Sequence, residues 1–453
     1  MGRDRSGKGA GMKAAFHTLG CKVNQYETEL IAQEFRRGGF EIVGEDDFAD
    51  VYVINTCTVT NLADRKSRQF VRRARKLNPD AVVAVTGCYV QVRPQDLAAI
   101  DGVSVICGTN EKHRIFELVE DQLRKRDVGG GKSEARLPYG DLTGYEELGI
   151  LEGMENRTRA YVKIEEGCDR FCSYCIIPYA RGKVRSRRPD EILEEVEGLL
   201  TKGYREIVLT GINTALYGTD AGSFGIGRLL RELDQLDGTF RIRLSSLEPT
   251  VVGPDEVKEV IRYDRLCHHL HLSLQSGSDS VLRRMNRRYT REEYLGLVSI
   301  LREFDPLYGV SADIIAGFPG ETEEEFEESV RIVSEAELCR THVFKYSPRE
   351  GTPAAAMSGQ IPGALKTSRS RRLIEAAERA ADAFFHKAEG SERTVLFEQR
   401  EDGRITGYTD NYIKVYADGD ETMFNQFYHV KLLKKYNDGM LGEIKAGPGK
   451  EKP

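Results

Sequence analysis

The stretch Val82–Gln91, VVAVTGCYVQ, opens with β-branched apolar residues and breaks at Thr86-Gly87-Cys88. A short continuous apolar run of this kind is typical of a strand buried on both faces of a sheet. Two earlier runs end in the same way, AAFHTLGC on Cys21 and DVYVINTC on Cys57. Three successive strands that each finish on a cysteine raise the question of what brings the three thiols together.

The segments that follow these strands have a helical pattern, over Tyr26–Arg37, over Leu62–Leu77 and from about Pro94. Strands that alternate with helices predict an α/β fold with a parallel sheet. Ligands of such sheets bind beyond the carboxyl ends of the strands, so we expect the three cysteines to face one crevice. Each precedes a helix, and helix dipoles favour the thiolate. From the residues alone, buried thiols that act as small apolar side chains remain an alternative.

The rest of the chain changes pattern twice. From Arg157 to about Pro353 strands and helices alternate again, which predicts a whole or partial (β/α) barrel with its site at the strands' carboxyl ends. Two of its helices begin with capping-box patterns, at Thr290 and Thr322. The last segment alternates with period two and predicts a small antiparallel β-barrel. The expected boundaries are 12–127 for the N-terminal domain, 128–155 for a linker, 156–388 for the (β/α) barrel with a bridging helix, 389–446 for the small barrel and 447–453 for a disordered tail.

Composition narrows the class of protein. The 453 residues carry a net charge of −6, so any contact with nucleic acid must come from local basic patches. No apolar run reaches the roughly 18 residues of a membrane span, and the polar N-terminus has no apolar signal core, which predicts a cytoplasmic protein without a membrane partner. Nine widely spaced cysteines in such a chain indicate metal ligands or catalytic thiols rather than disulfides. We assign Cys107, Cys267 and Cys339 to the interior.

The segment GCDRFCSYC places Cys168, Cys172 and Cys175 after the first barrel strand. A structural zinc site needs four closed ligands, whereas three thiolates on a cubane iron–sulfur cluster leave one iron open. This spacing, with Tyr174 before the third cysteine, resembles the radical S-adenosylmethionine (SAM) superfamily. The resemblance implies that the open iron binds SAM and that the reduced cluster cleaves it to a 5′-deoxyadenosyl radical.

Further motifs extend the resemblance over almost the whole chain, from Met12 to about Ile444. They are TLGCKVNQYETE, NTCTVT, VTGCYVQ, GCDRFCSYCIIPYARGKVRSR, HLHLSLQSGSD, MNRRYT, GFPGETEEEF and YSPREGTPA. Together they resemble the methylthiotransferase family. The resemblance implies an auxiliary 4Fe–4S cluster held by Cys21, Cys57 and Cys88, a radical SAM barrel with a second 4Fe–4S cluster, and a C-terminal barrel of the TRAM type.

Within the family, GCKVNQYE, VRRARKLNPDAVVAVTGCY and PYARGKVRSR look most like the members that methylthiolate C2 of N6-threonylcarbamoyladenosine-37 in tRNA. That reading implies the tRNA anticodon stem-loop, SAM and a reductant such as flavodoxin or ferredoxin as partners, and leaves the sulfur donor open. An adenine C–H has no acidic proton, so it calls for radical chemistry that a cofactor supplies. Alternatives are members that act on N6-isopentenyladenosine-37 or on an aspartate of a small-subunit ribosomal protein, another radical sulfur-inserting enzyme, and a non-catalytic zinc protein that binds RNA.

Polar residues at or beyond the barrel strand ends are candidates for SAM contacts, although some of them could simply cap helices or turns. With the aromatic residue of the cysteine motif they are Tyr174, Asn213, Ser245, Glu248, Gln275, Ser276 and Arg287. Basic residues are candidates for contacts with RNA phosphates, which would make binding salt-dependent; the alternative is a solvated surface, or a cofactor contact for Arg187. They are Arg185, Arg187, Arg188, Arg72 and Arg73. His268, His269 and His271 are expected to pack, because alternation along a strand splits their faces.

Overall fold

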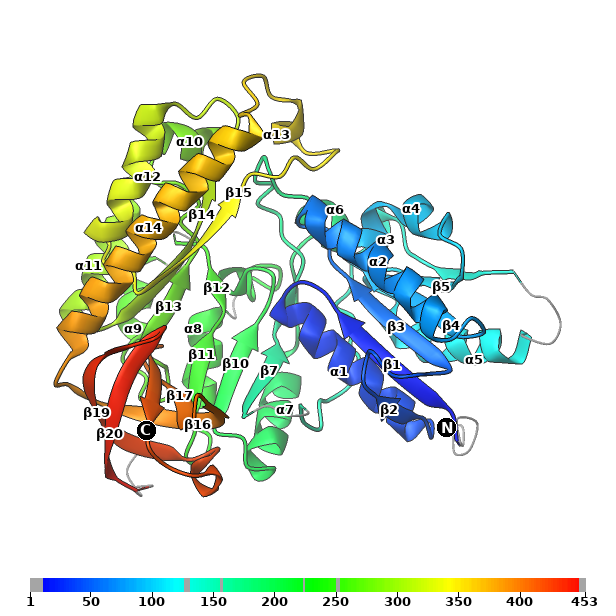
Figure 1. Cartoon of the computed structure of the whole chain (residues 1–453), viewed down its shortest axis with the longest axis horizontal. Helices are drawn as coiled ribbons and strands as arrows, with labels where there is room; N and C mark the ends of the chain where they lie inside the picture. The colour runs from blue at the N-terminus through cyan, green and yellow to red at the C-terminus, as the bar shows by residue number, and fades with distance from the viewer. Residues whose placement is uncertain (1–10, 126–130, 155–157, 223–224, 250–252, 448–453) are drawn as a thin grey trace. The chain divides into compact units, whose positions relative to one another are not determined.

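The structure is a computed structural model of the whole chain that describes residues 11–125, 131–154, 158–222, 225–249 and 253–447 (Figure 1). The chain divides into two compact units, and each is described by itself. The first comprises Met1–Glu152, Glu165–Arg187 and Ser347–Ala355; the second comprises Gly153–Ile164, Arg188–Tyr346 and Ala356–Pro453.

The first unit is built on a parallel sheet of six strands in the order β2-β1-β3-β4-β5-β6. Every residue of the central strands β3 and β4 is buried, and separate apolar cores cover the two faces of the sheet. The predicted α/β class is therefore confirmed. The strands are β1 (Lys13–Thr18), β2 (Glu41–Val43), β3 (Val51–Thr56), β4 (Val82–Gly87), β5 (Val103–Cys107) and β6 (Ser133–Ala135).

The helices of this unit differ in detail from the pattern read in the sequence. Helix α1 begins at Lys22, earlier than predicted, because Cys21 itself occupies the N-cap position. The helix predicted from Pro94 is short and is preceded by a separate helix that starts at Cys88. Strand β6 lies inside the segment predicted as a linker, so part of that segment completes the sheet. The helices are α1 (Lys22–Arg37), α2 (Asn61–Leu77), α3 (Cys88–Val92), α4 (Pro94–Ala98), η1 (Lys112–Arg114), α5 (Ile115–Lys125) and η3 (Tyr139–Asp141).

Two short segments from later in the chain also belong to the first unit. The segment Glu165–Arg187 contains β8 (Glu165–Glu166), α6 (Ile177–Arg181) and β9 (Arg185–Ser186), and β8 pairs with β9 in antiparallel fashion. The segment Ser347–Ala355 contains the start of α13 (Pro353–Ala356). The cysteine motif at 168–175 therefore folds with the N-terminal sheet.

The second unit contains the predicted partial barrel. Its strands form two parallel sheets, β11-β10-β7 and β12-β13-β14-β15. Strands β11 and β12 are separated only by Ser245, so one bent stretch of chain joins the sheets. The strands are β7 (Arg159–Lys163), β10 (Glu206–Thr210), β11 (Arg241–Leu244), β12 (Ser246–Leu247), β13 (His269–Leu272), β14 (Gly309–Ala316) and β15 (Arg340–Lys345).

Helices follow the strands of this barrel. Both predicted capping boxes are present, Thr290 with Glu293 and Thr322 with Glu325. The elements are α7 (Pro189–Thr201), η4 (Thr214–Leu216), α8 (Ile226–Asp234), α9 (Pro254–Val260), α10 (Asp279–Arg284), α11 (Arg291–Phe304) and α12 (Glu323–Glu335).

The two faces of the barrel strands differ in chemistry. Apolar residues such as Leu270, Leu272 and Val310 pack against helix residues in one large core. Because side chains alternate along a strand, their neighbours point to the opposite, inner face. That inner face carries Glu206, Arg241, Arg243, His269, His271, Ser311, Asp313, Arg340 and His342.

Helix α14 (Gly363–Ala388) leads into a closed barrel of five strands (Figure 1). The sequence predicted an antiparallel barrel, but β18 and β20 run parallel. A closed barrel with an odd number of strands cannot alternate direction at every pair, so one parallel pair is unavoidable. The elements are β16 (Glu392–Glu401), β17 (Arg404–Thr409), β18 (Lys414–Ala417), η5 (Glu421–Met423), β19 (Phe427–Tyr436) and β20 (Gly439–Ala446).

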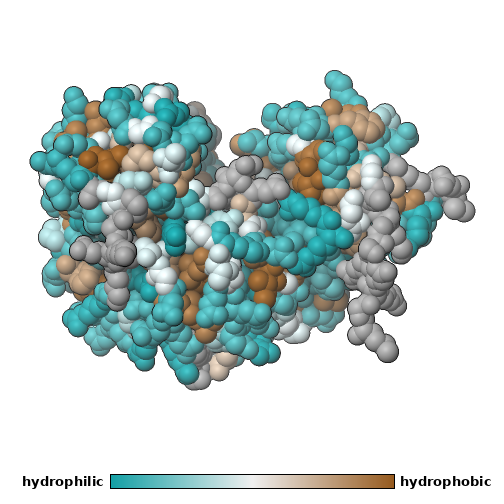
Figure 2. Space-filling view, turned by 90° about the horizontal axis from the view of Figure 1, so that it is seen from below, coloured by the Kyte–Doolittle hydropathy of each residue, from teal (hydrophilic) through white to brown (hydrophobic). Residues whose placement is uncertain are grey.

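Among the described residues, no helix combines the length and the apolar character that a membrane crossing requires. The face shown in Figure 2 is largely hydrophilic, with apolar residues in small groups. Apart from Gly447, the predicted tail 447–453 lies outside the described residues.

Candidate functional site

The structure brings Cys21, Cys57 and Cys88 together at the carboxyl ends of β1, β3 and β4. Each thiol lies in the electrostatic field of the others. The loop that carries Cys21 passes close to Cys57 at Gly20. This glycine has a φ of 104°, and a Cβ there would lie 3.0 Å from Cys57 Sγ. A side chain at residue 20 would occupy the space between the cysteine-bearing loops, so glycine is required by both conformation and packing.

Desolvation of the thiol opposes ionisation at two of these residues, Cys21 and Cys57. It raises the pKa of Cys21, and burial together with the field of Cys88 raises the pKa of Cys57 to about 12. At these two residues the helix dipoles expected to favour thiolates are outweighed. Cys21 and Cys57 are therefore protonated at neutral pH, and a metal that binds them must displace their protons.

A buried guanidinium completes this site. Arg181, at the end of α6, donates from Nε to Cys88 Sγ at 3.2 Å and from Nη1 to Glu27 Oε1 at 3.0 Å. It also forms an ion pair with Glu166, 2.5 Å away, and donates to Asn24 Oδ1 at 2.6 Å. Burial alone would lower the pKa of Arg181, but Cys88 and Glu27 raise it well above its usual value. The three thiols and the adjacent cation fit an anionic thiolate-bound cluster.

The motif cysteines Cys168, Cys172 and Cys175 lie in a loop between β8 and α6. The Cys168 amide donates to the Gly182 carbonyl at 3.0 Å, and the Cys175 amide donates to the Cys172 carbonyl at 2.9 Å. Burial, with smaller contributions from the other two thiols, raises the pKa of Cys168. Three thiols in one tight loop fit a cluster that needs one more ligand.

Backbone conformation holds this loop in place. Gly167 has a φ of 82°, and a Cβ there would lie 1.9 Å from the Lys183 carbonyl oxygen. The Ser173 carbonyl accepts from the Ala354 amide at 2.8 Å, which ties the loop to the segment Ser347–Ala355. Tyr174, a SAM candidate, is half-buried in the same loop.

In the second unit, three of the SAM candidates lie together at the strand ends. Asn213 Nδ2 donates to Glu248 Oε2 at 3.0 Å, and Asn213 Oδ1 accepts from the Glu248 amide at 3.3 Å. Arg287 Nη1 lies 3.8 Å from Glu248 Oε1. Ser245 Oγ, nearby on the chain, is buried and has no hydrogen-bond partner among the described residues. A polar ligand such as the methionyl end of SAM would satisfy that hydroxyl.

The other two candidates follow β13. Gln275 has a φ of 65°, a strained conformation for a non-glycine residue, and its amide donates to the Asp313 carbonyl at 2.7 Å. Ser276 Oγ lies 3.1 Å from Ser329 Oγ and accepts from the Ser278 amide at 3.2 Å. Ser276 therefore takes part in the local turn, while the backbone of Gln275 is held by hydrogen bonds to Asp313 and Ile315 of β14.

The basic candidates separate into buried and exposed residues. Arg185 and Arg187, predicted to contact RNA, are buried: Arg185 donates to backbone carbonyls, and Arg187 pairs with Glu147 at 2.9 Å. Their guanidiniums serve the fold of the first unit. Arg188, Arg72 and Arg73 are exposed and can reach a phosphate backbone.

Sequence reasoning missed two functional features. In the sequence, Arg181 is one of several basic residues that follow the cysteine motif, with Lys183, Arg185, Arg187 and Arg188, and nothing in that pattern indicates that its guanidinium donates to Cys88. The histidines at the start of β13 and just before it pack as expected: His268 Nδ1 lies 2.8 Å from Asp305 Oδ2, and His269 Nε2 lies 2.9 Å from Ser311 Oγ. His271, however, also gathers with Asp313 and His342. A pattern that runs across three strands is invisible in a linear sequence.

Comparisons with known proteins identify the family of the chain. Residues 162–333 match the radical SAM superfamily, and residues 13–108 match the Uncharacterized protein family UPF0004. The chain is 44% identical over 443 residues to the threonylcarbamoyladenosine tRNA methylthiotransferase MtaB of Bacillus subtilis, covering 95% of this chain and 96% of that protein. It is 38% identical to MtaB of Aquifex aeolicus, covering 90% and 97%.

More distant likenesses fit the same picture. The chain is 33% identical to the tRNA-2-methylthio-N(6)-dimethylallyladenosine synthase of Clostridium botulinum, covering 94% of this chain and 95% of that protein. Among solved structures, it resembles the radical S-adenosylmethionine methyltransferase TsrM from Kitasatospora setae with cobalamin and a [4Fe-4S] cluster bound. The TM-score is 0.55 at 17% identity, covering 76% of this chain and 77% of the other. This last likeness concerns the fold alone.

Proposed function

Because the chain belongs to the methylthiotransferase family of radical SAM enzymes, we propose that it converts N6-threonylcarbamoyladenosine-37 of tRNA to its 2-methylthio derivative. The choice of substrate is supported by identity: 44% and 38% to two relatives named for threonylcarbamoyladenosine, against 33% to a relative named for dimethylallyladenosine. The observation that carries the reaction type is the presence of two separate sets of three cysteines within the first unit.

We assign one 4Fe–4S cluster to Cys21, Cys57 and Cys88 and a second to Cys168, Cys172 and Cys175, each with one iron left open. When bound, these clusters and SAM supply the sulfur, the methyl group and the radical that acid–base chemistry cannot provide. Residues of the chain hold the clusters and SAM in place. Arg181 stabilises the negative charge of a cluster bound at Cys88. Asn213, Glu248 and Arg287 form a polar set suited to the charged end of SAM, and Ser245 Oγ offers a further hydrogen bond.

The proposed reaction needs partners that the chain does not itself supply. A low-potential reductant such as flavodoxin or ferredoxin would deliver electrons, and the tRNA anticodon stem-loop would present the nucleotide. Arg188, Arg72 and Arg73 are the exposed candidates for phosphate contacts. We place the reaction in the cytoplasm, where tRNA is modified.

Anaerobic reconstitution tests the assignment of the clusters. The wild type should carry about eight irons per chain with matching sulfide, as expected for two cubanes. Cys88→Ala and Cys172→Ala should each lose about half of the iron and all methylthiolation of a stem-loop that carries threonylcarbamoyladenosine. Cys107→Ala is the matched control, because this buried thiol donates only to the Glu111 carbonyl, and it should keep full iron. A colourless protein with stoichiometric zinc would contradict the proposal.

A further inference from the structure

The inner face of the partial barrel holds a second polar group, contributed by three adjacent strands. His271 on β13, Asp313 on β14 and His342 on β15 place one ligand atom each within 4.8 Å of one another. His271 Nε2 lies 3.3 Å from Asp313 Oδ2, and its Nδ1 lies 3.0 Å from Ser311 Oγ. The register that pairs Asp313 with His342 brings the third side chain to the same place.

This part of the inner face is accessible, whereas the neighbouring part is filled. In β10 and β11 the inward residues Glu206, Arg241 and Arg243 are buried. The two arginines donate to Glu206 and to backbone carbonyls at 408–410. Strand β15 is the last strand of its sheet, and its inward residues Arg340, His342 and Phe344 are exposed.

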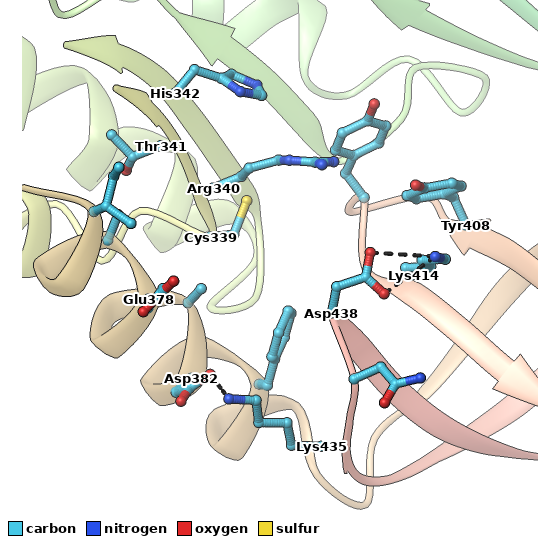
Figure 3. Close-up of a pocket in the computed structure, with 16 residues that line it drawn as sticks. Cys339, Arg340, Thr341, His342, Glu378, Asp382, Tyr408, Lys414, Lys435 and Asp438 are labelled. Carbon is cyan, nitrogen blue, oxygen red and sulfur yellow. Dashed lines mark hydrogen bonds and ion pairs between the residues drawn. The ribbon is translucent and has the colours of Figure 1, made fainter. Parts of the chain in front are cut away.

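A cavity of about 630 Å³ opens beside these residues, lined in part by Arg340, His342, Tyr408 and Tyr412 (Figure 3). Figure 3 shows Arg340 and His342 projecting from the same strand toward the side on which Tyr408 lies. The Arg340 guanidinium lies 5.8 Å from the centre of the Tyr412 ring, and that ring stacks on His269 of the inner face. The open part of the lumen therefore presents cationic and N–H donors beside one carboxylate.

Such a set matches a group that carries both an anion and a hydrogen-bond donor. An arginine and a histidine N–H donate to a carboxylate, the histidine in either protonation state. Asp313, already engaged by His271, can accept from a hydroxyl or an amide N–H. An apolar group would desolvate the Arg340 guanidinium without offering it a hydrogen-bond acceptor, which costs binding.

We propose that Arg340 and His342 bind the carboxylate of the substrate's threonylcarbamoyl group, with Asp313 accepting from its hydroxyl or amide. This subsite rests on the proposed function and explains the choice of nucleotide: an isopentenyl group has no atom for these donors. Asp313 lies three residues before the end of β14 at Ala316, about 10 Å at the rise of a strand. His271, however, lies one residue before the end of β13, and the Gln275 amide donates to the Asp313 carbonyl at 2.7 Å, so the subsite lies beside the SAM candidates that follow β13.

A divalent metal on His271, Asp313 and His342 is the competing occupant. It is disfavoured by Arg340, which projects from β15 to the same face two residues before His342 and repels a cation. It would also have to break the His271–Asp313 pair. Because a divalent metal would also prefer a carboxylate to its ester, the metal content of the protein is what distinguishes the two occupants.

Binding measurements on the cluster-loaded protein test whether Arg340 and His342 recognise the carboxylate. The probes are anticodon stem-loops that carry threonylcarbamoyladenosine or its carboxyl methyl ester, followed by fluorescence anisotropy. The wild type should bind the acid at least about 10-fold more tightly than the ester, the magnitude expected for charge-assisted hydrogen bonds. His342→Gln and Arg340→Gln should each reduce this ratio toward one while leaving affinity for the ester nearly unchanged.

The matched control is Lys345→Gln on the same strand. Lys345 points to the other face, toward Thr367, so this variant removes an exposed cation without touching the subsite and should keep the ratio. A ratio that stays at the wild-type value in both subsite variants overturns the proposal. So does a stoichiometric divalent metal, measured beside the iron, that is lost in His342→Gln. Methylthiolation of the acid by the wild type in either case shows that the proposed function stands and only the subsite fails.

Discussion

At the scale of single residues, folding buries some of the basic residues at 181–188 and leaves others exposed, and Arg181 is among the buried ones. Its guanidinium is fully buried among Cys88, Glu27 and Glu166, and Glu27 is 154 residues away in sequence. Lys112 also lies 3.3 Å from Glu27. Glu27 thus pairs with two buried cations, and Arg181 also donates to the thiol of Cys88.

Replacement of Arg181 by methionine should destabilise the protein by about 3–5 kcal/mol, because it leaves buried carboxylates without their main partner. Guanidinium unfolding of the anaerobically purified apoprotein measures this directly. The matched control is Arg188→Met in the same motif, whose exposed guanidinium pairs with Asp190; it should leave unfolding unchanged. Equal stability of the two variants would contradict the role given to Arg181.

The candidate site could be read from the sequence only where its residues are close along the chain. The spacing of Cys168, Cys172 and Cys175 is visible in eight residues, and each N-terminal cysteine marks a strand end. Whether Arg185 or Arg188 faces solvent depends instead on partners brought by folding. Likewise, His342 comes to lie beside Asp313 and His271 only when β15 pairs with β14.

At the scale of elements, the turn between β17 and β18 closes one end of the partial barrel. Arg243 donates to the Thr409 and Asp410 carbonyls at 3.1 and 3.0 Å, and Tyr412 stacks on His269 with ring centres 4.5 Å apart. The small barrel is therefore an integral part of the second unit. A deletion from about Glu389 would remove these partners, so lost tRNA turnover after such a deletion would not by itself prove an RNA-binding role.

Gly309, at the start of β14, tests this packing. A Cβ there would lie 2.3 Å from the Asn411 carbonyl oxygen, which is backbone and cannot move aside cheaply. Gly309→Ala should destabilise the protein by about 1–3 kcal/mol, as overpacking does.

The control for this substitution is Gly296→Ala. Gly296 lies inside α11, where an added methyl group meets no atom within 4 Å, and the change should stabilise by up to about 1 kcal/mol. Thermal unfolding of the two variants should shift in opposite directions. Shifts of the same sign would argue that the turn at 409–412 is not packed against β14 as described.

Glu206 makes the stability of the contact between the partial barrel and the small barrel depend on pH, because it pairs with Arg243, which donates to the turn between β17 and β18. Burial would raise the pKa of its carboxyl, but Arg241, Arg243 and Arg159 hold it far below its usual value. A depressed pKa means that the stabilisation is complete above the unfolded value of about 4.3 and is lost as the pH falls toward the native value.

Glu206→Gln should therefore cost about 3–5 kcal/mol at pH 7, because it leaves buried guanidiniums uncompensated. The difference in unfolding free energy between wild type and variant should stay constant from pH 7 to 5 and shrink below about pH 4.3. Urea unfolding across this range measures the difference. A difference that does not change with pH would show that Glu206 is not the carboxylate responsible.

At the scale of the whole molecule, the order of motifs along the chain predicted the α/β class, the partial barrel and the small barrel. The periodicity of hydrophobic residues and the residue types at strand ends involve residues that are close along the chain, so they can be read from the sequence. The parallel pair of β18 and β20, and the return of Ser347–Ala355 to the first unit, were not predictable because they depend on barrel closure and on contacts distant in sequence.

The most direct test of the central claim is mass spectrometry of tRNA nucleosides from cells with and without this gene. Loss of 2-methylthio-N6-threonylcarbamoyladenosine, with accumulation of its unmethylthiolated precursor, is the predicted result. Expression of the wild-type gene should restore it, and the Cys88→Ala and Cys172→Ala variants should not. Persistence of that nucleoside, with loss of the isopentenyl counterpart or with no change in either, would contradict the account.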